Sequence, residues 1–167
     1  MTARLFGRLI VTDADLRTAA ATFAESLRYF SPTRVIYIET GGTRLGKHLA
    51  AALAVPCEGL DIRYPHSRRR SPIARSLLFP IKELLYRVQT PTVGDRQKRT
   101  GLTDDRIVLV DDSASSGRTL RLALSLLEKQ GIPRRRIRTL VYRRGRSAAK
   151  ETDLFHTDRP VHFFRRP

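Results

Sequence analysis

The sequence predicts an α/β domain with a central, mostly parallel sheet flanked by helices. Segments 34–62 and 106–133 carry this prediction, because each has a strand, a glycine-containing turn and a helix in that order. In the first segment a second strand follows at Val55 to Ile62, and strands joined through a helix in this way pair in parallel. A further strand at Ile137 to Tyr142 extends the pattern. With no repeat and no interdomain linker, we expect one domain over residues 1–167.

The first helix is expected to begin at Thr12, because Thr12 and Asp15 have the spacing of a capping box. Ser31-Pro32 ends its apolar stripe. The strand that follows, Arg34 to Glu39, is rich in β-branched and aromatic residues. A glycine turn then opens a second helix, whose apolar face consists of Leu45, Leu49 and Leu53.

Residues 63–105 are expected to form a basic insert that includes the run Arg68-Arg69-Arg70. A helical stripe with an internal Pro80 crosses this insert, formed by Ile73, Leu77, Ile81, Leu84 and Val88. Three interpretations stay open for the stripe: packing in the core, a dimer contact, and a lid over a bound anion that brings in Arg96, Lys98 or Arg99.

Regular structure resumes with a short apolar strand at Arg106 to Val110. A helix follows from Gly117 to the stop at Gly131-Ile132-Pro133, with Leu120, Ala123, Leu124 and Leu127 facing inward. The aromatic tail, residues 150–167, is expected to join the N-terminal segment in a small hood.

The charge of the chain is strongly unbalanced, with 32 Lys and Arg against 16 Asp and Glu and a formal net charge of +16. Such an excess favours anionic partners such as a polyphosphate, a nucleic acid or a membrane surface, although solvated arginine-rich faces would produce the same number. The single cysteine, Cys57, excludes an internal disulfide and a cysteine-rich metal site. Without a signal-peptide pattern or an uncharged stretch of about 20 residues, we expect a cytoplasmic protein with no membrane partner.

The strongest chemical signal lies between the strand at 106–110 and the next helix, where two adjacent carboxylates, Asp111 and Asp112, precede a turn rich in hydroxyls and glycine. The amides at the start of a helix bind anions, and Gly117 allows close approach of the backbone. Paired carboxylates suit the vicinal hydroxyls of a ribose or a hydrated Mg²⁺. The alternative interpretation is an ordinary turn whose serines cap the helix.

This run resembles the phosphoribosyl diphosphate motif of type I phosphoribosyltransferases, and Ser116-Gly117-Arg118-Thr119 matches the end of that motif. The resemblance implies the type I phosphoribosyltransferase fold, with Asp111 and Asp112 on the ribose hydroxyls and on Mg²⁺ through water. It implies that the turn wraps the 5′-phosphate of the substrate; its residues are Ser113, Ala114, Ser115, Ser116, Gly117, Arg118 and Thr119.

The earlier glycine turn fits the same family, in which the first strand-to-helix turn binds the diphosphate through backbone amides. The matching residues are Thr40, Gly41, Gly42 and Thr43, with Arg44 as a candidate for the positive charge that many relatives place at position 40. A Gly-Gly turn alone indicates only backbone freedom.

The order of elements is similar to the xanthine/guanine branch of the family, which implies that Arg143 and Phe163 contact the acceptor base. This chain departs from that branch at Ser115, where relatives have an Asp that assists proton transfer, and serine is not a base near neutral pH. We therefore expect a Mg²⁺-dependent enzyme that transfers phosphoribose to a nucleobase-like acceptor and releases diphosphate, with a homodimer as the expected assembly. Two alternatives stay open: a regulator that senses the same ligand and binds RNA through the basic surface, and a sensor without activity.

Overall fold

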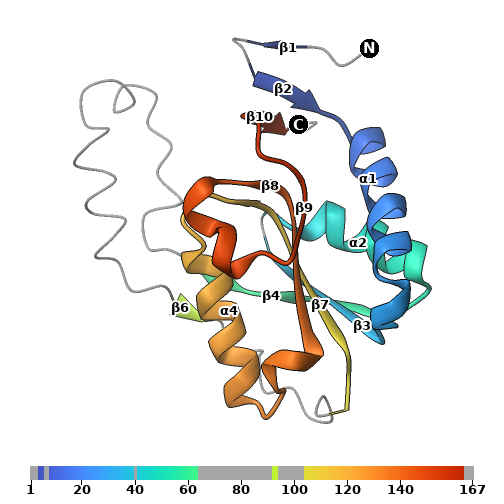
Figure 1. The fold of residues 1–167 in the computed structure, drawn as a ribbon, viewed down its shortest axis with the longest axis vertical. Helices are drawn as coiled ribbons and strands as arrows, with labels where there is room; N and C mark the ends of the chain where they lie inside the picture. The colour runs from blue at the N-terminus through green and yellow to red at the C-terminus, as the bar shows by residue number, and fades with distance from the viewer. Residues whose placement is uncertain (1–3, 6–7, 40, 64–91, 94–103, 164–167) are drawn as a thin grey trace. The chain divides into compact units, whose positions relative to one another are not determined.

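The computed structural model describes residues 4–5, 8–39, 41–63, 92–93 and 104–163 (Figure 1). Two compact units divide the chain: residues 1–60 together with 99–167 form the first, and residues 61–98 form the second. The apolar stripe predicted between residues 73 and 88, and the basic side chains at 96–99, lie outside the described residues. In the second unit, β5 (Ile62–Arg63) pairs antiparallel with β6 (Thr92–Val93).

The core of the first unit is a five-stranded sheet in which every neighbouring pair is parallel, as predicted. Its strands, in spatial order, are β4 (Cys57–Leu60), β3 (Arg34–Ile38), β7 (Ile107–Ala114), β8 (Ile137–Arg144) and β9 (Leu154–Thr157). The central strands β3 and β7 are nearly continuous runs of apolar residues because both faces of a parallel sheet are covered by helices.

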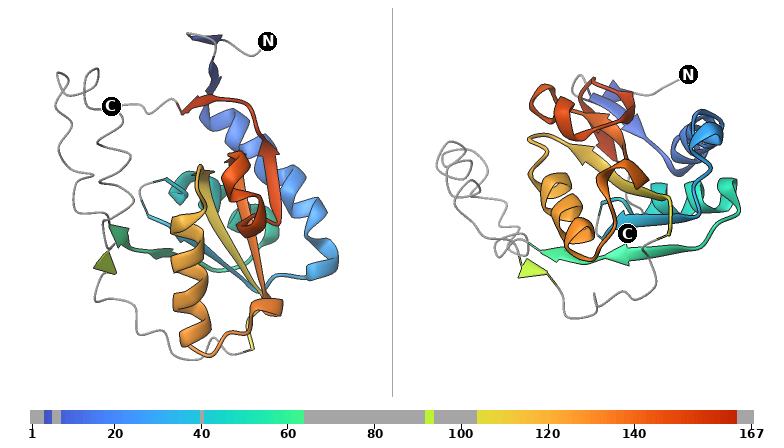
Figure 2. Two further views of the ribbon diagram at one scale, coloured as in Figure 1. Left: turned by 60° about the vertical axis from the view of Figure 1, so that its left-hand side comes forward. Right: turned by 60° about the horizontal axis from the view of Figure 1, so that its bottom comes forward.

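Helices cover both faces of this sheet (Figure 2). The helices α1 (Asp13–Ser26) and α2 (Thr43–Leu53) pack on the face that presents Val35, Val108 and Leu140. The other face is covered by α4 (Arg118–Lys129), whose buried residues are the four predicted from the sequence: Leu120, Ala123, Leu124 and Leu127. Short 3₁₀ turns complete the unit at Arg28–Phe30 (η1), Arg134–Arg136 (η4) and Arg146–Glu151 (η5).

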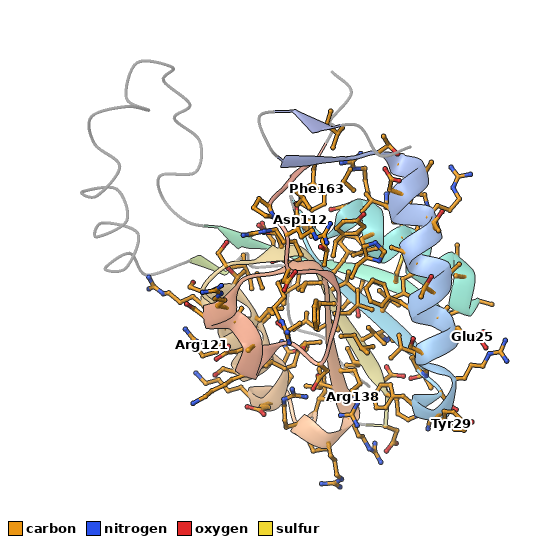
Figure 3. All side chains as sticks on the ribbon, turned by 45° about the horizontal axis from the view of Figure 1, so that its top comes forward. Glu25, Tyr29, Asp112, Arg121, Arg138 and Phe163 are labelled. Atoms are coloured by element: carbon orange, nitrogen blue, oxygen red, sulfur yellow. The ribbon has the colours of Figure 1, made fainter. Side chains whose placement is uncertain are left out.

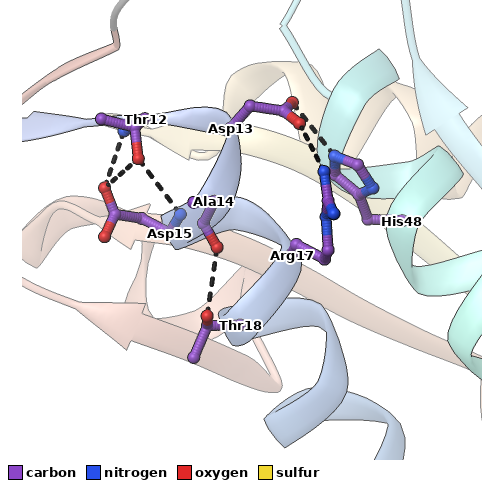
Figure 4. Close-up of polar contacts among 7 residues, drawn as sticks. All are labelled: Thr12, Asp13, Ala14, Asp15, Arg17, Thr18 and His48. Carbon is purple, nitrogen blue, oxygen red and sulfur yellow. Dashed lines mark hydrogen bonds and ion pairs between the residues drawn. The ribbon is translucent and has the colours of Figure 1, made fainter.

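The start of α1 confirms the predicted capping box (Figure 4). The Thr12 backbone N–H donates to Oδ2 of Asp15 at 2.8 Å, and the Asp15 N–H donates to Oγ1 of Thr12 at 3.3 Å. These bonds satisfy amides that the helix itself leaves unpaired. Hydrogen bonding by Thr12 also holds the pKa of Asp15 below its ordinary value.

A second, three-stranded sheet joins the two ends of the chain. It consists of β1 (Arg4–Leu5), β2 (Arg8–Val11) and β10 (Val161–Phe163), with β10 parallel to β2. The predicted association of N- and C-terminal segments is therefore confirmed for these strands.

Several strand boundaries differ from the sequence prediction. The strand expected at Ile137 to Tyr142 continues to Arg144. The strand expected at Val55 to Ile62 breaks at Asp61, where the second unit begins. The strand expected to end at Val110 continues to Ala114, because pairing with β8 extends through Asp111, Ser113 and Ala114. The tail, expected to form only a hood, supplies β9 as an edge strand of the main sheet before it reaches β10.

Within the described part of the chain, no helix combines the length and apolar character that a membrane span requires.

Candidate functional site

The two glycine turns identified in the sequence lie next to each other. One connects β3 to α2 and the other connects β7 to α4, and β3 and β7 are hydrogen-bonded neighbours in the sheet. Both turns therefore emerge at the carboxyl edge of parallel strands, where open α/β sheets bind their ligands.

Gly41 brings the two turns into direct contact. A Cβ atom placed on Gly41 would lie 2.6 Å from Oδ1 of Asp112 and 2.9 Å from Oδ1 of Asp111. The neighbouring Gly42 is buried, and a Cβ there would collide with the carbonyl oxygen of Val110. Only glycine allows the β3–α2 turn to come this close to the acid pair. The structure thus unites the predicted diphosphate turn and the predicted ribose-binding carboxylates in one site.

Asp111 is a buried carboxylate, with 8 % of the residue exposed. Burial, reinforced by the negative charge of Asp112, raises the pKa of Asp111 well above its ordinary value, although the Asp112 backbone N–H that donates to Asp111 Oδ1 at 2.8 Å opposes the shift. The charged form of Asp111 is thus poorly stabilised in the unliganded protein. A hydroxyl donor or a cation at this position would stabilise the negative charge of Asp111.

The β7–α4 turn has the form of an anion-binding helix start. Gly117 is the N-cap of α4 and adopts a left-handed backbone with φ of 72°, which favours glycine. Gly117 has no side chain with which to cap the helix, and Ser115 and Ser116 are exposed. Arg118 and Thr119 form the first turn of α4, so the helix dipole and the hydroxyls converge at this end. Ser113 and Ala114 lie on β7 itself, and Ala114 is buried.

The segment after β8 supports this turn from behind, a feature that the sequence analysis missed. Gly145 donates its N–H to the Ala114 carbonyl at 2.7 Å, and a Cβ on Gly145 would lie 2.7 Å from the Ser115 carbonyl oxygen. Glu151 lies against Gly117, since a Cβ there would be 2.5 Å from its Oε2. Arg121 of α4 binds the other oxygen of Glu151. Gly145 follows a strand and was recognisable as a turn; nothing in the sequence signals the long-range contact of Glu151.

The predicted acceptor residues are not brought together. Arg143 pairs in register with Ser113 on β7, and its guanidinium reaches Oγ of Ser115 at 3.5 Å. Phe163 instead packs edge-on against Tyr142, with ring centroids 5.8 Å apart. Because successive side chains of a strand point to opposite faces, Tyr142 and Arg143 face different sides of the sheet. Arg143 therefore borders the turn, whereas Phe163 belongs to the aromatic cluster beside α1.

The remaining predicted residues occupy the start of α2. Thr43 is its first residue and Arg44 its second, and both are partly buried. Thr40 lies outside the described residues. Figure 3 shows Asp112 toward one end of the first unit and Arg138 and Tyr29 toward the other.

The donor set fits Mg²⁺ held jointly with a substrate. Among the described residues, no three His, Cys, Asp or Glu side chains gather into a metal site of their own. Proteins commonly bind Mg²⁺ through one or two carboxylates, while substrate phosphates and water supply its other ligands. The carboxyl edge of this sheet offers two such carboxylates.

Comparison with known proteins agrees with the fold. Residues 12–164 match the phosphoribosyl transferase domain family. The structure is similar to a purine phosphoribosyltransferase from Pyrococcus horikoshii (TM-score 0.72, 19 % identity, 97 % of each chain covered). It is also similar to a hypothetical protein from Neisseria gonorrhoeae with bound ppGpp (TM-score 0.66, 16 % identity, 96 % of this chain and 90 % of that one). A xanthine-guanine-hypoxanthine phosphoribosyltransferase from Helicobacter pylori is similar as well (TM-score 0.61, 15 % identity, 93 % and 89 % covered).

No curated protein matches the sequence. The family match spans most of the chain, and the structural matches show the same architecture, a parallel sheet with helices on both faces. The chain therefore belongs to the phosphoribosyl transferase domain family and has the type I phosphoribosyltransferase fold.

Proposed function

We propose that this protein binds 5-phosphoribosyl 1-diphosphate (PRPP) at the adjoining turns and transfers the phosphoribosyl group to a nitrogen of a nucleobase-like acceptor, releasing diphosphate. The observation that supports this most strongly is the contact of Gly41 with both aspartates. PRPP has a diphosphate directly on the sugar carbon next to its hydroxyls, so a protein that binds it needs a diphosphate site and a hydroxyl site in contact.

Each part of the ligand has a complementary feature. The carboxylates of Asp111 and Asp112 accept hydrogen bonds from the two ribose hydroxyls. The Gly41-Gly42 backbone gives the diphosphate close access to main-chain amides. The start of α4, with Ser115, Ser116 and Thr119, receives the 5′-phosphate.

The reaction forms a bond between the acceptor nitrogen and C1 of the ribose and breaks the bond from C1 to the diphosphate oxygen. The electron pair of that bond leaves with the diphosphate, and the proton of the acceptor nitrogen passes to solvent. Positive charge builds up on the sugar ring in the transition state, beside the two carboxylates. The protein contributes by fixing both ends of PRPP so that C1 is open to attack.

Mg²⁺ at Asp111 and Asp112 would neutralise the diphosphate charge when bound. The two side chains then have a second role: they position the cation beside the ribose hydroxyls.

The test is diphosphate release from PRPP with a panel of bases, with and without Mg²⁺. We expect Asp111→Asn combined with Asp112→Asn to abolish turnover while the circular dichroism spectrum stays native. Asp158→Asn, a change at an exposed aspartate outside the turns, is the matched control and should keep full activity. Turnover that survives in the double variant would refute the assignment.

A sensor that binds PRPP without transfer is a second candidate, motivated by serine at position 115. It predicts saturable binding of PRPP with no diphosphate release for any acceptor. Neither the family match nor the three structures reported above points to an RNA-binding regulator, and that alternative is not carried forward.

A further inference from the structure

Arg143 differs from other half-buried arginines of the first unit. Three of these pair with a carboxylate: Arg34 with Asp105 at 2.8 Å, Arg134 with Asp153 at 3.2 Å and Arg136 with Asp104 at 3.1 Å. Two others lie over aromatic rings, Arg138 over Phe30 and Arg144 over Phe155. Across the described residues, Arg143 has no such partner. Its Nε atom is buried without a hydrogen bond, and its one polar contact is Nη1 to Ser115 Oγ at 3.5 Å, the outer limit of a hydrogen bond.

The position of Arg143 relates this unsatisfied charge to the PRPP site. Arg143 lies near the carboxyl end of β8, in register with Ser113 of β7, the strand that carries the two aspartates. Two residues later, Gly145 binds the backbone of Ala114 and so fixes the end of β8 against the β7–α4 turn. The guanidinium is therefore held beside the turn proposed to bind phosphoribose.

A buried guanidinium N–H without an acceptor is costly, and such groups are normally paired in a folded protein. The turn side chain that Arg143 contacts, Ser115, is neutral and provides only a long contact. The free Nε–H and a neighbouring Nη–H of an arginine form a planar fork that matches a carboxylate in two parallel hydrogen bonds. The missing acceptor is thus best supplied by a ligand.

We infer that the acceptor is a heterocycle bearing a carboxylate, and that Arg143 binds this carboxylate while a ring nitrogen attacks C1. This inference rests on the proposed function and specifies its substrate class. The carboxylate stays intact in the reaction: the nitrogen–C1 bond forms and the C1–diphosphate bond breaks, with its electron pair leaving on the diphosphate. A ring nitrogen of the uracil type releases its proton to solvent, whereas a pyridine nitrogen has no proton to lose and becomes a pyridinium. Arg143 acts as a specificity-determining residue.

The experiment uses acceptors that differ only in the carboxylate. Uracil is compared with uracil-6-carboxylate, and pyridine-3-carboxamide with pyridine-3-carboxylate, with hypoxanthine and adenine as neutral bases. The measured quantity is kcat/KM for diphosphate release by the full chain with PRPP and Mg²⁺. We expect at least one carboxylated ring to be used about 10- to 100-fold better than its neutral counterpart, since a buried charged donor is otherwise unpaired.

Substitution of Arg143 separates acceptor binding from PRPP binding. Arg143→Gln should raise KM for the carboxylated acceptor by about 10-fold or more and leave the calorimetric Kd of PRPP unchanged, and Arg143→Lys should restore part of the loss. Arg144→Gln is the matched control, because Arg144 lies over the Phe155 ring at 3.6 Å and has no part in the acceptor contact.

Two results would overturn the inference: preference for neutral bases with no release from any carboxylated ring, or an Arg143→Gln variant that loses affinity for PRPP. A wild-type protein that fails to bind PRPP at all would refute the proposed function itself.

Discussion

Replacement of Asp111 with Asn is expected to stabilise the unliganded protein while removing its affinity for PRPP. Asp111 is buried, and burial together with the Asp112 charge raises its pKa well above the ordinary value of 3.8. Near neutral pH the folded protein thus holds a carboxylate in an environment that disfavours its charge. Asparagine has nearly the same shape without the charge.

The size of the effect follows from the contacts. The Oδ1 atoms of both carboxylates lie close to one point beside Gly41 and are therefore at most about 5.5 Å apart, where repulsion at an effective dielectric constant of about 20 amounts to about 3 kcal/mol. Loss of the charge weakens the hydrogen bond from the Asp112 N–H by about 1–2 kcal/mol. The difference is a gain of about 1–2 kcal/mol, or about 2–8 °C in Tm for a chain of this size.

The effect should depend on pH with a definite sign. A carboxyl whose folded pKa is raised costs no stability below the unfolded value of 3.8, because it is neutral in both states. As pH rises through the folded pKa, the carboxyl ionises, and its buried charge lowers the stability of the folded protein. The advantage of Asp111→Asn should therefore be largest near pH 7–8 and shrink as pH falls toward 3.8, measured by thermal unfolding without ligand.

Asp105→Asn is the matched control. Burial tends to raise the pKa of Asp105, but hydrogen bonds from Arg34 and Thr33 outweigh it and lower the pKa. This substitution should destabilise the protein by about 1–3 kcal/mol. The reasoning would be refuted if Asp111→Asn lowered Tm at pH 7, or if both variants changed Tm in the same direction.

Three further predictions follow from single contacts. Gly41→Ala should weaken PRPP binding by about 10-fold or more in calorimetry, because its methyl group would lie 2.6 Å from Asp112 Oδ1; equal affinity would exclude the close approach. Thr12→Ala should lower the free energy of unfolding by about 1 kcal/mol in urea denaturation through loss of the capping box, and an unchanged midpoint would contradict that role. Glu151→Gln removes a negative charge beside Gly117 and should tighten PRPP binding severalfold at low salt; weaker binding would contradict this and show that the support Glu151 gives to the turn outweighs its charge.

The sequence predicted the parts of the fold that rest on local patterns. The cap at Thr12 and the buried face of α4 are set by residues within a few positions of each other, and both are confirmed. The parallel order of β3 and β4 follows from the helix between them. These features need no knowledge of distant contacts.

Features set by distant contacts were missed. The extension of β7 through Asp111 to Ala114 depends on pairing with β8, some thirty positions along the chain. The β9 strand is too short to recognise without its partner, and the tail was assigned to the hood alone. In the site, adjacent turns could be expected from strand order, but the burial of Asp111 and the contact of Glu151 with Gly117 required the coordinates.

The central claim is that one site, built from the Gly41 turn and the Asp111–Asp112 pair, binds PRPP. Isothermal titration calorimetry of PRPP into the protein with Mg²⁺ measures this directly. We predict one site per chain in the wild type and a loss of affinity of about 100-fold or more in the Asp111→Asn, Asp112→Asn double variant. Absence of binding to the wild type, or equal affinity in the two proteins, would contradict the account.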